Sequence, residues 1–229
     1  MHTGFQSTIQ TAKTIASLEW RLEWRQGHQI ASVGLFALSS VYIAFQAARH
    51  GVSADAWSAM LWMVYLFSGF TAVGRLFDRE RSLTRRYLQW TVDPLGLMLG
   101  KLAHAIVTTT GLSAIVLCGF LLLLGLPAGD TAKTGVVVLA AWLGGLSMTT
   151  TLVFVTAIAS QVKTGGSALG AILGLPLLIP QLILTTRLTV GALQGTPWPL
   201  VAEIPLSLTT LCAGTSIMAC ILFPYIWRA

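Results

Sequence analysis

Long stretches without charge are the feature that most constrains this chain. Windows of at least 19 residues hold no Asp, Glu, Lys or Arg, and they cover residues 26–48, 56–74, 102–129, 134–162, 164–186 and 204–227. About 20 apolar residues, each rising about 1.5 Å along a helix, cross a hydrocarbon core of ~30 Å. Each window therefore predicts one transmembrane helix, six in all.

Composition leads to the same class of protein. Hydrophobic residues make up 55% of the chain and charged residues 10%, against about a quarter charged in soluble domains. The apolar windows are continuous and lack the period-2 alternation of membrane β-strands. We expect an all-α integral membrane protein in which residues 1–229 form one domain. The first 25 residues have no apolar core of a signal peptide, so we expect the N-terminus to be retained.

The distribution of Lys and Arg predicts the orientation. With the N-terminus inside, eleven of the fourteen basic residues face the cytoplasm and three, Arg49, Lys133 and Arg187, face outward. Short cytoplasmic loops are enriched in Lys and Arg, so we expect both termini to be cytoplasmic. The net charge of +6 is then explained by topology and anionic lipid, and no nucleic-acid partner is expected.

The leader, residues 1–25, precedes the first window and is amphipathic between residues 14 and 25. On a helical projection Ile15, Leu18 and Leu22 form an apolar stripe, and Trp20 and Trp24 form a second stripe. Glu19 and Glu23 separate the two stripes on one side of the helix, and Arg21 and Arg25 separate them on the other. Such a helix can lie along the membrane surface with its Trp pair among the lipid headgroups. The alternative is a solvated amphipathic leader.

A basic segment between the second and third windows is the main functional candidate. Residues 75–101 contain six of the basic residues, and Leu76, Leu83, Tyr87 and Trp90 recur at helical spacing until Pro94 ends the pattern. Residues 75–95 therefore predict either a helix whose arginines bind lipid phosphates or a coupling helix that docks on a cytosolic partner. The docking candidates are Asp78, Arg79, Glu80, Leu83, Arg85, Arg86 and Tyr87.

The string at residues 96–101 has the glycines and lysine of a phosphate-binding loop, but its spacing excludes that site. Three residues separate Gly96 from Gly100 where four are needed, and Leu102 stands where a Ser or Thr would bind magnesium. We expect Lys101 to extend along the membrane surface toward water. The sequence also has no acid–base pair or Ser/His/Asp arrangement, so no catalytic residue and no enzyme activity are expected.

The fifth window is rich in small residues. Gly166, Gly170 and Gly174 recur every four residues, and Pro176 and Pro180 follow one turn apart. Glycines at this spacing let membrane helices approach closely, and the prolines predict a kink. The glycine face could pack within the chain or form a dimer interface. The stretch at 187–203 contains two further glycines and two prolines, so we expect an outer re-entrant or interfacial excursion there.

Metal and cofactor signals are weak. The four histidines show no ligand spacing, and His104, which lies within the third window, is a candidate ligand for haem iron. The three cysteines form no CxxC or CxxCH pattern. No bound metal and no resident cofactor are therefore expected.

Several strings resemble the permease B subunits of cytochrome c maturation, the CcmB haem exporter family within the ABC-2 type permeases. They are residues 81–88 (RSLTRRYL), 93–94 (DP), 100–101 (GK), 157–160 (AIAS), 174–180 (GLPLLIP) and 222–228 (LFPYIWR). The resemblance covers most of the chain from about residue 66 onward.

This resemblance implies a function and partners. It implies a homodimeric permease in the bacterial inner membrane, working with two copies of a P-loop ATPase that binds ATP. Further membrane subunits and a haem chaperone would complete the assembly, with haem as a possible substrate. Two alternatives stay open: an exporter of a drug, lipid or polysaccharide, and a membrane scaffold that transports nothing.

Overall fold

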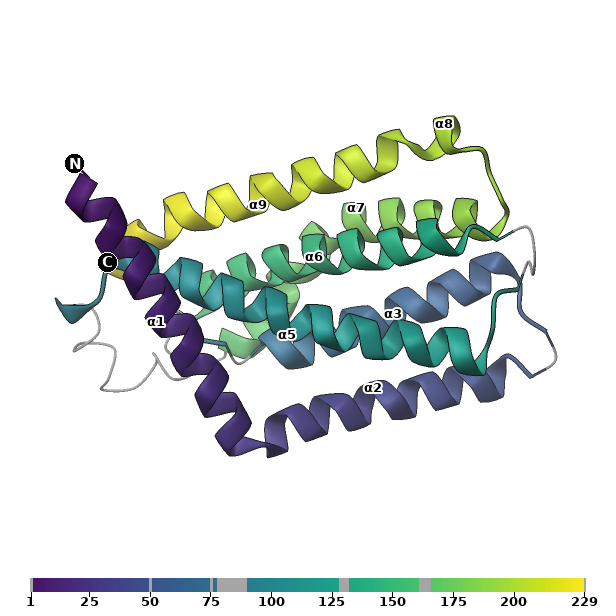
Figure 1. Ribbon diagram of the computed structural model, residues 1–229, viewed down its shortest axis with the longest axis horizontal. Coiled ribbons are helices and arrows are strands. Elements are labelled where there is room, and N and C mark those ends of the chain that lie inside the picture. The colour runs from purple at the N-terminus through teal and green to yellow at the C-terminus, as the bar shows by residue number, and fades with distance from the viewer. Residues whose placement is uncertain are drawn as a thin grey trace.

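The computed structural model describes residues 2–49, 51–74, 76–77, 90–127, 132–160 and 166–228, and the secondary structure within these ranges is entirely helical. The helices are α1 His2–Gln26, α2 His28–Ala47, α3 Ala54–Val73, α5 Pro94–Leu123, α6 Thr134–Ala159, α7 Gly166–Leu193, α8 Trp198–Val201 and α9 Glu203–Arg228. Figure 1 shows α2, α3, α5, α6, α7 and α9 running lengthwise through one bundle. α1 crosses the end of the bundle at which both termini lie.

Length and apolar composition confirm the membrane class of this bundle. Within the described ranges, five segments are long and apolar enough to cross a bilayer: Ala54–Val73, Pro94–Leu123, Thr134–Ala159, Ile172–Leu193 and Trp198–Trp227. In α2 the apolar part, Ala31–Ala47, is shorter than these, although α2 lies beside α3 and α5 in the bundle (Figure 1). The all-α membrane fold is thus confirmed, and the sixth span remains a prediction.

α6 is the central helix, and polar bonds tie its neighbours together inside the bundle. Gln181 of α7 is buried and donates to Thr151 Oγ1 of α6 at 2.6 Å. Trp62 of α3 donates its indole N–H to Thr189 Oγ1 of α7 at 3.0 Å. In a bilayer such bonds between helices add to close packing, because lipid competes poorly for polar groups. They fix α3 and α7 around α6.

Gly170 and Gly174 of α7 pack against neighbouring helices of this chain. Gly170 is buried, and a Cβ there would lie 3.5 Å from the Cβ of Ala159. A Cβ at Gly174 would lie 3.4 Å from the ring of Phe70. These glycines therefore pack on α6 and α3, while Gly166 begins the helix. A role of this face in a dimer interface stays a prediction.

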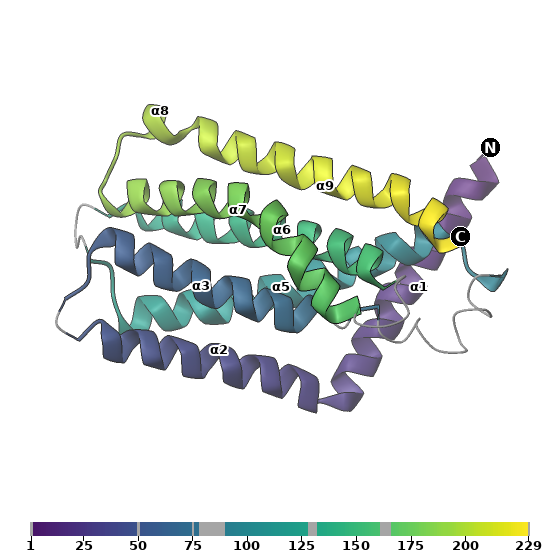
Figure 2. The same cartoon turned by 180° about the vertical axis from the view of Figure 1, so that it is seen from behind.

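α7 is bent, as Figure 2 shows, and it contains both prolines. Each proline lacks the amide that would bond the carbonyl four residues earlier, which opens the helix on one side. Pro176 and Pro180 are both exposed, so both rings lie on the outer face of α7. Assignment of the bend to these prolines is our interpretation.

The stretch at 187–203 differs from the sequence-based expectation at its start. α7 continues as a helix to Leu193, so Arg187 belongs to it, and only the turn before α8 is irregular. Lys133 stabilises this end, because its backbone N–H donates to the carbonyl of Ala192 and its Nζ to that of Thr196. The charge of Arg187 suggested that the helix ends there, but the apolar residues after Arg187 continue its backbone hydrogen bonding to Leu193.

The leader helix is longer than predicted and joins α2 at a sharp elbow. α1 occupies residues 2–26 rather than 14–25. Gly27 at the elbow has φ of +29°, a value that favours glycine because it has no Cβ. α1 is not an isolated surface helix, since it packs along α5.

Candidate functional site

The predicted docking residues belong to a stretch that the structure does not describe. Asp78, Arg79, Glu80, Leu83, Arg85, Arg86 and Tyr87 all lie outside the described residues. Their flanks are described and differ sharply. Phe77 is 1% exposed, whereas Trp90 is 92% exposed. The docking role of the segment stays a prediction. The residue before it is buried in the protein, and the residue after it is exposed on the surface.

Lys101, near the start of α5, connects the N-terminal flank of this segment to the bundle. Its side chain is fully buried, and Nζ donates to Glu19 Oε1 of α1 at 3.1 Å. Nζ also donates to the carbonyl oxygen of Leu76 and lies 5.0 Å from the centroid of the Phe77 ring. One ammonium therefore joins α1, α5 and the residues that lead into the docking segment. The expectation that Lys101 reaches toward water is wrong, because carboxylate, carbonyl and ring acceptors surround it inside the protein.

A second polar contact joins α1 and α5 one turn further along. His104 Nε2 lies 2.9 Å from Glu23 Oε2, and Thr108 Oγ1 donates to the same oxygen at 3.4 Å. The ring of Trp20 meets His104 edge-on, with centroids 6.3 Å apart. To ligate haem iron through Nε2, His104 would first have to release Glu23. Its Nδ1 is buried and has no hydrogen-bond partner within the described part of the chain.

Glycines let α1 come close enough for these contacts. A Cβ at Gly96 would lie 2.8 Å from the Cβ of Thr11, and one at Gly100 would lie 2.8 Å from the Cβ of Ile15. Neither distance is possible for real side chains, so both positions require glycine as the helices now pack. The loop-like string at 96–101 is thus a helical seat for α1.

The start of α5 is tied to α1 by a shared side chain. Asp93 is the N-cap of α5, and its side chain accepts a hydrogen bond from the amide of Gly96 at 3.2 Å. The same carboxylate accepts a hydrogen bond from the hydroxyl of Thr8 on α1 at 2.8 Å. Thr8 with Asp93 and Glu23 with Thr108 are both pairs 85 residues apart in sequence. The two helices therefore run in the same direction and stay in contact over about four turns.

Sequence reasoning missed this junction, although parts of its signal were present. Glu19 and Glu23 are four residues apart, and Lys101 and His104 three apart, which puts each pair on one helix face. Nothing in the sequence says that these faces meet. Among the described residues, no three His, Cys, Asp or Glu side chains gather as a metal site would require.

Comparison with protein families then identifies the chain. The family model described as "CcmB protein" matches residues 10–226, a range that begins within α1, contains the docking segment and ends within α9. The chain belongs to the CcmB family. Comparison with curated proteins gave no match. CcmB proteins are multi-pass membrane permease subunits for haem export in cytochrome c maturation, and they work with an ATPase and other maturation components.

Proposed function

We propose that this CcmB chain transmits the conformational change of its partner ATPase through residues 75–95 to the junction of α1 and α5. The observation that supports this most directly is the buried Lys101 ammonium, which binds both the Leu76 carbonyl and Glu19. A displacement of the segment at Leu76 would pull on Lys101, and through it on both helices. In this proposal the segment docks the ATPase with Leu83, Arg85, Arg86 and Tyr87 at the centre of the contact.

The assembly in this proposal is symmetric, and its end rich in Lys and Arg faces the cytoplasm. Two CcmB chains form a homodimer in the bacterial inner membrane, and each binds one of two ATPase copies; other membrane subunits and a haem chaperone complete it. The bundle end at which both termini lie, where α1 crosses the bundle, then faces the cytoplasm (Figure 1). The excess of Lys and Arg on that side supports the orientation. ATP binds in the partner, and haem is the substrate.

Docking is tested by co-purification with the ATPase. We expect Tyr87→Asp and Arg85→Glu/Arg86→Glu to lose the ATPase, because the first places a charge in an apolar contact and the second reverses two charges. Arg49→Glu is the matched control, since Arg49 is an exposed arginine beyond the far end of α2. If both docking variants retain the ATPase as the control does, the docking proposal is wrong.

Transmission is tested separately from docking with Lys101→Met. This variant leaves residues 78–89 unchanged, so the ATPase should still bind. We expect membranes with the variant to accumulate much less c-type cytochrome, since movement of the segment no longer reaches α1 through Lys101. Normal ATPase binding together with normal cytochrome accumulation would contradict the role of Lys101.

A further inference from the structure

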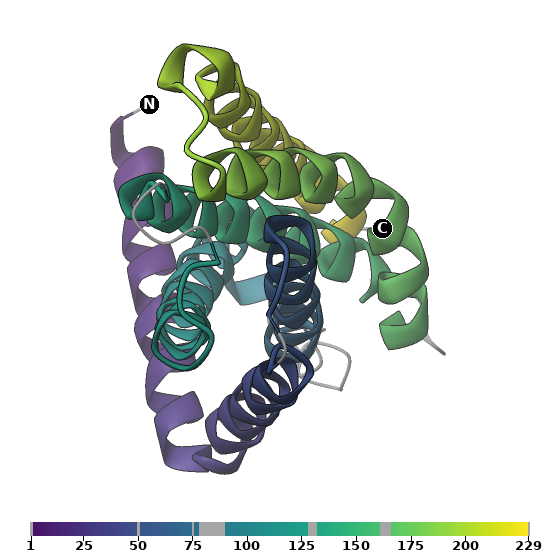
Figure 3. The same cartoon turned by 90° about the vertical axis from the view of Figure 1, so that its right-hand side faces the viewer.

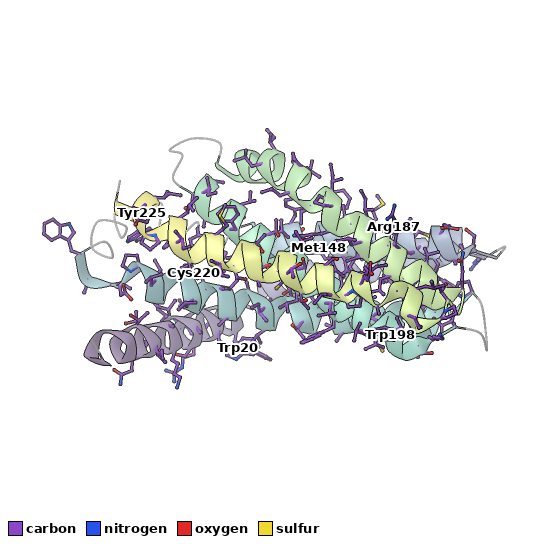
Figure 4. All side chains as sticks on the ribbon, turned by 90° about the horizontal axis from the view of Figure 1, so that it is seen from above. Trp20, Met148, Arg187, Trp198, Cys220 and Tyr225 are labelled. Atoms are coloured by element: carbon purple, nitrogen blue, oxygen red, sulfur yellow. The ribbon has the colours of Figure 1, made fainter. Side chains whose placement is uncertain are left out.

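A hollow lies beside the elbow between α1 and α2. It has a volume of about 190 Å³, and its walls come from α1, α2, α3 and α5. Figure 3 shows α1 descending along one side of the bundle to its elbow with α2. Trp20 and Trp24 of α1 form one wall, and Val33 and Val107 lie on α2 and α5. In Figure 4, Trp20 lies at the edge of the bundle, away from α9.

Glycines keep this hollow open. Gly34 of α2 and Gly111 of α5 both line it, and a Cβ at either position would meet no atom within 4 Å. The seat glycines Gly96 and Gly100, by contrast, would clash with α1. A mainly apolar hollow of this size forfeits dispersion contacts if it stays empty. In a bilayer the apolar molecule at hand is a lipid acyl chain.

The turns of α1 that supply Trp20 and Trp24 to the hollow also carry the groups that a phospholipid headgroup requires. The Trp20 and Trp24 rings pair with centroids 6.0 Å apart, an arrangement suited to the headgroup level. Arg21 and Arg25 are exposed on the same turns of α1, and arginine is the side chain best suited to phosphate. The acidic group in the wall, Glu23, faces His104 and Thr108, so its charge is directed toward α5.

We propose that this hollow binds one phospholipid, with an acyl chain between α1, α2 and α5 and its phosphate at Arg21 and Arg25. The lipid fills the inner side of the elbow at Gly27 and holds α1 at its angle to α2. The site is independent of the ATPase docking proposal, because neither arginine belongs to residues 75–95.

The acyl-chain part is tested by native mass spectrometry of the detergent-solubilised protein titrated with dioleoylphosphatidylglycerol. We expect one tight adduct per chain. Gly34→Leu/Gly111→Leu fills the hollow and should weaken this adduct at least about tenfold. Gly214→Leu is the control, since a Cβ at Gly214 on α9 also meets nothing within 4 Å, and it should bind as wild type does. Equal binding by wild type and the double variant would overturn the proposal.

The phosphate part is tested with Arg21→Gln/Arg25→Gln. This variant should bind dioleoylphosphatidylglycerol several-fold more weakly than wild type but dioleoylglycerol, which lacks the phosphate, equally well. Equal loss for both lipids would show that the arginines only support the fold and would overturn the assignment of the phosphate.

A third measurement does not depend on Gly34→Leu/Gly111→Leu, and so it tests the site even if that variant fails to fold. In wild type, phosphatidylglycerol with brominated acyl chains should quench the fluorescence that Trp20→Phe/Trp24→Phe removes. Absence of that quenching would refute the site. Loss of a haem absorbance, rather than of lipid, in Gly34→Leu/Gly111→Leu would also refute it and make the hollow part of the haem route.

Discussion

The ion pair between Lys101 and Glu19 gives the sharpest quantitative prediction. Lys101→Met removes the ammonium from a site that is fully buried, while the Glu19 side chain is 13% exposed. Removing one member of a buried pair costs about 3–5 kcal/mol. Since Glu19 retains some access to solvent, we expect a loss of about 3 kcal/mol in the free energy of unfolding.

A double variant separates the energy of the ion pair from the energy of side-chain packing at the same positions. In Glu19→Leu/Lys101→Met both charges are replaced by apolar groups of similar size, which is often nearly neutral for stability. We therefore expect the double variant to be less destabilised than the sum of the two single variants by about 2 kcal/mol. The free energies come from reversible unfolding in mixed dodecylmaltoside and dodecylsulfate micelles. Lys13→Met, at an exposed lysine of α1, should change stability by less than about 0.5 kcal/mol.

Additivity would refute this reasoning. If the effects of Glu19→Leu and Lys101→Met sum to that of the double variant within about 0.5 kcal/mol, the two side chains do not stabilise each other. α1 would then be held to α5 by its glycine seat, its apolar contacts and the polar contacts at Asp93 and Glu23.

Two further predictions concern close packing and polar bonds. Gly100→Ala should destabilise the protein by about 1–3 kcal/mol, because its Cβ would lie 2.7 Å from the carbonyl oxygen of Ala12. Gly111→Ala, with nothing within 4 Å, should be neutral or stabilising by up to about 1 kcal/mol, and the same micelle unfolding detects both; changes of the same sign would contradict the glycine seat. Gln181→Leu removes the 2.6 Å bond to Thr151 and should cost about 0.6–1.7 kcal/mol, so a loss above about 3 kcal/mol would mean that Gln181 does more than join two helices.

Much of the fold follows from sequence because local patterns decide it. A continuous apolar window must become a helix in lipid, since only a helix satisfies every backbone polar group within its own segment. The windows at 56–74 and 134–162 accordingly match α3 and α6 to within three residues at each end, whereas α5 begins eight residues before its window, at Pro94, and ends six residues before the window does. Boundaries failed where charge was the only signal. Arg187 suggested the end of a span, yet α7 continues to Leu193.

The length of α1 could not be predicted for a related reason. Residues 2–13 are mostly polar and have no clear apolar stripe, so only residues 14–25 suggested a helix. The structure supplies what the pattern lacked, because Thr8 binds Asp93 and Thr11 lies in the seat at Gly96. Contact with α5 therefore stabilises a helical turn that its own composition does not favour.

The sequence by itself determined that this chain is an all-helical membrane protein with a basic segment between two apolar helices, and it contained the strings that resemble the CcmB family. Only the tertiary structure decided the partners of its charges. Glu19 and Lys101 are 82 residues apart in sequence and 3.1 Å apart in space. The strength of a charge pair depends on distance and burial, and both are set by the packing of α1 into the glycine seat of α5.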